Sequence, residues 1–151
     1  MPGFGTVMAT NIANWLWKRT QMPTPPPVLF IALHIVDPTD AGTGTEMSGG
    51  GYARVQLNPD SAVGVNVNWN GVVDPGAGAP LEMTAKATVA YPQASADWNS
   101  QLSIGFWGLW DASTNGTFYL SGTITGGVIV RAGNTLQVTG GSPGTFKFTI
   151  Q

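Results

Sequence analysis

The alternation of apolar and polar residues predicts a series of short β-strands that follow a single N-terminal helix. From residue 28 onward the chain alternates in hydrophobicity or shows short continuous apolar runs, which indicate half-buried and fully buried strands respectively. The expected strands are 28–35, 52–57, 63–69, 83–91, 101–110, 118–125, 128–131, 136–138 and 145–150.

The connections between these runs have the composition of turns. Asn70-Gly71 and Asn115-Gly116 suit tight turns that need positive φ, and Gly126-Gly127 separates two apolar runs. Outside residues 10–20 there is no helical period, which argues against alternating strands and helices. The sequence therefore predicts an all-β fold, a single β-sandwich of jelly-roll type.

The run 101–110 has large apolar residues at both alternating sets of positions. One face is expected to carry Leu102, Ile104, Phe106 and Trp110, and the other Trp107 and Leu109. Trp110 is assigned to the core. Something must then cover the second face of this strand.

The N-terminal segment differs from the rest of the chain. Thr10 or Asn11 can cap a short helix over residues 12–19, whose apolar residues fall on one stripe. Four prolines within residues 23–27 exclude further helix and stiffen a linker. We expect an arm, helix and linker at 1–27 and a β-sandwich domain at 28–151.

Low charge and many tryptophans favour an assembled protein. Only 9% of the 151 residues are charged and six are tryptophan, which leaves little polar surface for a free monomer. We expect a partner interface and self-association as a dimer or trimer. The residues assigned to the interface are Ile12, Trp15, Leu16, Trp17 and Trp107.

Charge and composition also argue against nucleic-acid binding, a membrane span and secretion. The six basic residues are scattered and the net charge is −2, so no nucleic acid is expected as a partner. The longest apolar run, 28–36, is interrupted by His34 and is too short to cross a membrane. No secretory signal precedes the helix, so we expect synthesis in the cytoplasm.

The segment DPTDAGTGTEMSGGGYARV, residues 37–55, carries a resemblance. Together with 97–112, 120–124 and 132–136, in the same order, it resembles a family of small tailed-phage virion structural proteins. Members are usually labelled tail-fibre-like or capsid decoration (cement) proteins. The resemblance implies a structural role in the virion, without enzyme activity or cofactors, and synthesis in the host bacterial cytoplasm. The sequence departs from the family pattern at 63–80 and in its triple proline.

Within that resemblance, the sequence favours one role. Fibres usually have a shaft of coiled-coil, collagen or β-solenoid repeats, and no such repeat is present. We therefore expect a decoration protein that docks on the major capsid protein or another virion subunit. The alternative is a tail, neck or fibre component, possibly a glycan-binding receptor-recognition module.

The acidic residues of segment 37–55 allow two interpretations. Asp37, Asp40 and Glu46 could supply oxygen ligands to calcium, but the spacing fits no EF-hand loop and the surroundings are ordinary turn chemistry. Tyr52 and Arg54 lie on the same expected strand face, so Arg54 can pair with Asp37 or Glu46. We assign these five residues to a structural loop and expect no metal.

Other candidates for chemistry are weaker. His34, the only histidine, lies within an apolar strand and is expected to pack there as a hydrogen-bonded residue. Residues 140–144 match the pattern G-x-S-x-G, but a proline and a strand follow where a nucleophile elbow needs a helix. We expect a hairpin loop there, and no catalytic residue in the chain.

Glycan binding depends on the tryptophans. Trp69 lies among Asn66, Asn68 and Asn70, and an exposed tryptophan beside amides can stack on a sugar ring. Packing in the core or in interfaces is the competing interpretation, since aromatic residues are enriched in both.

Overall fold

The computed structural model describes residues 3–57, 81–84, 89–138 and 147–150. Its elements are, in order, α1 (Thr6–Lys18), β1 (Phe30–His34), β2 (Val55–Gln56), β3 (Leu81–Thr84), β4 (Val89–Ala90), the 3₁₀ helix η1 (Trp98–Gln101), β5 (Ile104–Trp110), β6 (Phe118–Val128), β7 (Gln137–Val138) and β8 (Lys147–Ile150). The expected strand 63–69, with Trp69, and the loop 140–144 lie outside the described residues. Within those residues, no helix is long and apolar enough to cross a membrane.

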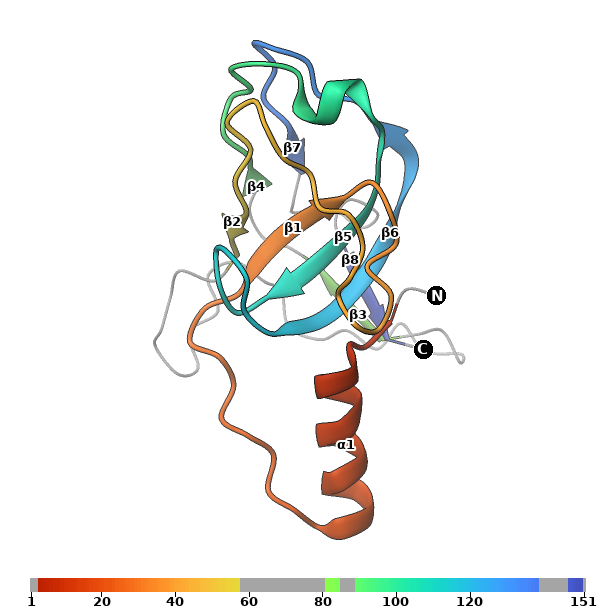
Figure 1. Ribbon diagram of the computed structural model, residues 1–151. Coiled ribbons are helices and arrows are strands. Elements are labelled where there is room, and N and C mark those ends of the chain that lie inside the picture. The colour runs from red at the N-terminus through yellow and green to blue at the C-terminus, as the bar shows by residue number, and fades with distance from the viewer. Residues whose placement is uncertain (1–2, 58–80, 85–88, 139–146, 151) are drawn as a thin grey trace.

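Strands dominate the structure, which supports the all-β class (Figure 1). A four-stranded antiparallel sheet has the order β2-β1-β5-β6, and two-stranded antiparallel sheets pair β3 with β8 and β4 with β7. This arrangement of described strands does not establish a jelly roll, which stays a prediction.

The two faces of the four-stranded sheet pack differently. Ile31 and Leu33 of β1 and Trp107 and Leu109 of β5 belong to the main hydrophobic core, which also contains the fully buried Trp98. On the opposite face lies a smaller cluster of buried residues: Ala32, Trp110 and Phe118. Because side chains alternate along a strand, one β-sheet separates both clusters. Both faces of β5 are thus covered within the chain.

The expected boundary at Gly126-Gly127 is wrong, because β6 runs through both glycines. Each has positive φ, 91° and 58°, and the short step from Ile104 to Phe106 on β5 faces the longer step from Thr123 to Val128 on β6. The glycines therefore form an irregularity inside one strand, as in a β-bulge.

The same irregularity changes the faces expected for strand 101–110. Ile104 joins Trp107 and Leu109 in the main core instead of sharing a face with Trp110. Leu102 precedes the start of β5 and is exposed. A register shift of this kind leaves no trace in the simple alternation of the sequence.

The expected helix exists, but its predicted start is wrong. It begins at Thr6 after Gly5, and neither Thr10 nor Asn11 caps it. Gly5 N donates to Tyr119 O (2.6 Å), while Gly3 O accepts from Ser121 N (2.9 Å), so this short segment pairs with β6. Long-range pairing with the sheet fixes the point at which the helix can begin.

The helix α1 ends at Lys18, and all of its residues keep some contact with solvent. Arg19 adopts φ 53° at its C-terminal end, and no residue of α1 is buried. Figure 1 shows α1 projecting away from the sheets, at the opposite end of the molecule from η1. The division at residue 27 stays a prediction, although residues 3–5 bond to the body of the molecule.

Candidate functional site

The loop 37–46 covers the face of the four-stranded sheet that carries Ala32, Trp110 and Phe118. Asp37 Oδ1 accepts from Thr39 N (2.9 Å) in a local turn. Asp40 O accepts from the backbone N of Thr6 (2.7 Å), which connects the loop to the first turn of α1. A Cβ on Gly42 would lie 2.9 Å from both Phe118 Cβ and Trp110 Cη2. Glycine is therefore needed where this backbone lies against the aromatic cluster.

Glu46 is the centre of a polar network under this loop. Its carboxylate accepts Arg54 Nε at Oε1 (2.9 Å) and Arg54 Nη2 at Oε2 (2.7 Å). Tyr52 Oη donates to Glu46 Oε1 (3.1 Å) and accepts from Leu33 N (2.9 Å). Of the two acidic partners expected for Arg54, the structure brings Glu46 to it in a bidentate pair. Burial raises the pKa of Tyr52 well above its usual value.

Arg54 also holds the turn between β5 and β6. Its Nη1 donates to Ala112 O (3.0 Å) and Asn115 O (2.8 Å), and its guanidinium carbon lies 4.2 Å from the centroid of the Trp110 ring. The Arg54 side chain is only 6% exposed, against 27% for Glu46. One cation therefore joins the loop 37–46, the β5–β6 turn and the aromatic cluster.

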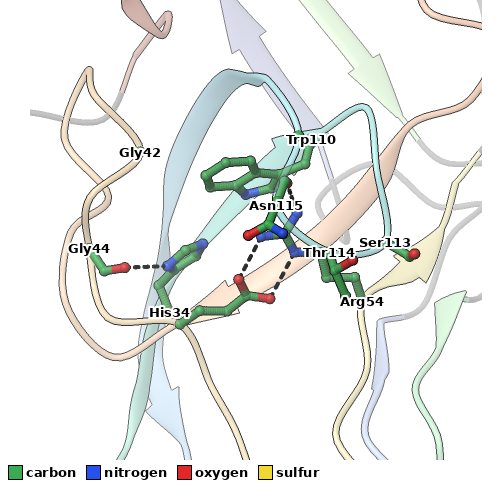
Figure 2. Close-up of a pocket in the computed structure, with 10 residues that line it drawn as sticks. His34, Gly42, Gly44, Arg54, Trp110, Ser113, Thr114 and Asn115 are labelled. Atoms are coloured by element: carbon green, nitrogen blue, oxygen red, sulfur yellow. Dashed lines mark hydrogen bonds and ion pairs between the residues drawn. The ribbon is translucent and has the colours of Figure 1, made fainter.

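His34 packs beside this network (Figure 2). Its Nδ1 lies 3.3 Å from Gly44 O, its ring stacks with Trp110 at a centroid distance of 6.4 Å, and its backbone bridges to Glu46. Burial lowers its pKa, opposed mainly by the charge of Glu46 and by the bond to Gly44. The histidine is a packed residue of the sheet.

Because burial lowers the pKa of His34, the folded protein should become less stable as the pH falls. The unfolded chain binds a proton at His34 near its ordinary pKa of 6.5, while the folded chain resists it. The free energy of unfolding should therefore decrease as pH falls from 7 through 6.5 toward the lowered folded pKa. Urea unfolding measured across this range should show the slope in the natural chain.

His34→Asn provides the control, because its amide can still donate to Gly44 O and does not titrate. As His34 is the only histidine, the variant should lose the dependence between pH 7 and 5. An equal slope in both proteins would contradict the assignment.

The turn 49–51 connects the loop to the main core. Gly49, Gly50 and Gly51 have φ of 74°, 55° and 77°. Gly50 O accepts from Trp98 Nε1 (3.2 Å) and from Ser95 N (2.9 Å). The triple glycine is thus a backbone requirement of the fold.

A pocket of about 460 Å³ opens between the loop 37–46 and the β5–β6 turn (Figure 2). Its lining residues are His34, Gly42, Gly44, Glu46, Arg54, Trp110, Ser113, Thr114, Asn115 and Gly116. The charges at its base are already paired with each other, and Arg54 covers a face of Trp110. Trp110 therefore does not offer that face for stacking on a sugar ring.

The three acidic residues considered as calcium ligands, Asp37, Asp40 and Glu46, do not form a metal-binding group. Glu46 binds Arg54, and Asp37 bonds within its own turn. Across the described part of the chain, no group of three histidine or acidic side chains could hold a metal ion.

The residues assigned to the partner interface divide into two groups. On α1, Trp15, Leu16 and Trp17 are exposed by 54%, 58% and 84%, and Ile12 is half-buried. Trp107 is placed differently: it lies in the main core, 7% exposed. Its ring fills the space over Gly122, where a Cβ would overlap it. Trp107 therefore does not form part of the accessible surface of the single chain.

Sequence reasoning missed the acceptors that complete the Arg54 site. Ala112 and Asn115 contribute only backbone carbonyls, which no side-chain pattern reveals. The nearby Asp111 holds the same turn through Thr117 N (2.6 Å). The Asn115-Gly116 pair predicts a turn at this position, but it does not predict that the turn contacts Arg54.

Comparison with known families gives a match over residues 3–144, to the family described as podophage GP4 fiber I protein gp80. No curated protein matches the chain. The family supports a structural component of the phage virion and favours a fibre over capsid decoration. The chain belongs to the podophage GP4 fiber I protein gp80 family.

Proposed function

We propose that this protein is a non-enzymatic component of a podophage fibre, and that α1 attaches it to a neighbouring virion subunit. The family match supports a fibre component. The expectation of a decoration protein rested on the missing shaft repeat. A compact chain can nevertheless join a fibre as one module among several, so the missing repeat does not oppose this role.

The exposed apolar surface of α1 is the observation that carries the proposed attachment. An isolated 13-residue helix is only marginally stable in water. The rest of the chain does not bury any residue of α1. Trp15, Leu16 and Trp17 are consecutive, so they span about 200° of the helix circumference. A partner surface would bury these large side chains, as interface cores commonly bury tryptophan.

The distribution of charge along the chain indicates what kind of partner surface α1 would bind. Residues 1–27 contain Lys18 and Arg19 and no acidic residue, so the other four basic and eight acidic residues give the rest of the chain a net charge of −4. An apolar surface bordered by carboxylates would complement the C-terminal end of α1. A second copy of this chain has the required sign of charge, which supports a homo-oligomer.

Substituting the exposed apolar residues tests the attachment. The triple change Trp15→Gln, Leu16→Gln and Trp17→Gln should strongly reduce incorporation into particles, scored by immunoblot of purified virions. The β-sheet fold should persist in circular dichroism, since these side chains lie mainly in water. Thr10→Gln, at an exposed position of the same helix, is the matched control. Normal incorporation of the triple variant would refute the attachment.

Sedimentation at micromolar concentration tests whether the partner is a second copy. We expect a dimer or trimer of the 15.7 kDa chain that dissociates in the triple glutamine variant. A monomer in both proteins would assign α1 to a different virion subunit.

A further inference from the structure

The turn between β5 and β6 contains an asparagine followed by a glycine, Asn115-Gly116, and both residues are exposed. Both also have positive φ, 54° at Asn115 and 83° at Gly116. Within the described part of the chain, neither the side-chain amide of Asn115 nor the backbone nitrogen of Gly116 makes a hydrogen bond. The contact that restrains Asn115 is therefore the bond that its backbone carbonyl accepts from Arg54.

The chemistry of an asparagine followed by glycine is deamidation through a cyclic imide. Gly116 N loses its proton and forms a bond to Asn115 Cγ, while the bond from Cγ to Nδ2 breaks and the amide leaves as ammonia. Water then opens the succinimide at either of its two carbonyls, which yields aspartate or isoaspartate without any oxidation or reduction. Glycine favours the attack because it has no Cβ to hinder the approach of its nitrogen.

The folded turn opposes this ring closure. With φ of 54°, Asn115 lies in the left-handed region, where the next backbone nitrogen points away from the residue's own Cβ. The imide can therefore form only after a rotation about the Cα–C bond of Asn115. That rotation moves the carbonyl oxygen of Asn115, which accepts from Arg54 Nη1 at 2.8 Å. The bond from Arg54 thus resists the rotation that the reaction needs.

We propose that Asn115 is a deamidation site and that Arg54 sets the rate of its deamidation by holding the Asn115 carbonyl. Arg54 can do this because its own guanidinium is fixed by the bidentate pair with Glu46 and by the bond to Ala112 O. Its side chain is only 6% exposed, so water does not readily replace these partners. The proposal does not depend on the fibre role or on the attachment through α1.

Deamidation changes both the charge and the length of the turn. Asp111 Oδ1 already accepts from Thr117 N (2.6 Å) and would lie 2.5 Å from a Cβ on Gly116. A new carboxylate at position 115 adds a second negative charge to this turn, and isoaspartate also lengthens its main chain by one methylene group. The isoaspartate form should therefore lose the fit of the turn to Arg54 and unfold at a lower urea concentration than the unmodified chain.

Peptide mapping of the full chain after incubation in mildly alkaline buffer tests the site. Trypsin cleavage after Lys86 and Arg131 places Asn115 in one peptide, and the second Asn-Gly pair, Asn70-Gly71, falls in another. Asn70-Gly71 lies outside the described residues and serves as the chemical reference within each sample. Asn115 should react in the folded chain, but more slowly than in a synthetic peptide of residues 112–118. No product at Asn115 in the folded chain or its variants, or a rate equal to that of the peptide, would overturn the proposal.

Two variants separate the contact with Arg54 from general loss of stability. Arg54→Ala should raise the rate at Asn115, relative to that at Asn70, by about tenfold or more, the factor expected for one lost charge-assisted hydrogen bond. Gly50→Ala is the matched control, because it crowds the main core and leaves the bond to Asn115 in place, so the ratio should not change. An equal rise in both variants would assign the rate to global unfolding and refute the role of Arg54. If Arg54→Ala does not fold, Arg54→Lys, which loses the planar fork, must still raise the ratio, and an unchanged ratio would refute that role.

Discussion

Arg54→Ala is expected to lower the free energy of unfolding by about 3 kcal/mol. The change removes the bidentate pair with Glu46, the two bonds to Ala112 O and Asn115 O, and the cation over Trp110. It leaves Glu46 as a half-buried charge whose remaining described partner is Tyr52. We place the loss at the low end for buried pairs because Glu46 keeps 27% of its surface in water. Urea unfolding followed by tryptophan fluorescence measures it.

Two further substitutions separate charge from geometry. Arg54→Lys keeps the charge but loses the planar fork, so it should recover only part of the stability. Arg131→Ala removes a cation at an exposed position and should change stability by no more than about 0.5 kcal/mol. A similar small effect for Arg54→Ala would mean that Arg54 does not hold the loops together.

Gly50→Ala is expected to destabilise the protein far more than the adjacent Gly49→Ala. Both positions have positive φ, 55° and 74°, so both variants lose about 1–2 kcal/mol through backbone strain. A Cβ at Gly49 meets nothing within 4 Å, whereas one at Gly50 would overlap Ala96 O and approach Trp98 Cδ1 to 2.8 Å. Overpacking adds about 1–3 kcal/mol at Gly50 alone.

Gly49→Ala and Gly50→Ala make the same chemical change and differ mainly in the space around the new Cβ. Thermal and urea unfolding of both variants should therefore isolate the close approach of the turn 49–51 to the main core. Equal losses at the two glycines would contradict that approach.

Much of the strand pattern could be predicted because burial imposes a period of two on the sequence. The apolar run 28–35 and the pattern of 101–110 predict β1 and β5, with boundaries that differ by a few residues. The predictions failed where pairing between distant segments decided the outcome. The β6 irregularity at Gly126-Gly127 and the start of α1 both depend on partners far along the chain, which local patterns do not contain.

The residues of the candidate site could likewise be predicted only in part from the sequence. The pattern of segment 37–55 places Tyr52 and Arg54 on one strand face and offers Asp37 or Glu46 as the acidic partner of Arg54, and the structure selects Glu46. The role of Trp110 as a platform for Arg54 and the backbone acceptors in the β5–β6 turn required the folded arrangement. The sequence predicts an interface position for Trp107, because it does not reveal that Gly122 leaves space for its ring in the core.

The function proposed here depends on where the protein sits in the particle. Cryo-electron microscopy of purified virions labelled with an antibody fragment against this chain tests that position directly. We expect label confined to the fibres, at a small copy number set by their symmetry. Label distributed over the head lattice would contradict it and restore the role of a capsid decoration protein.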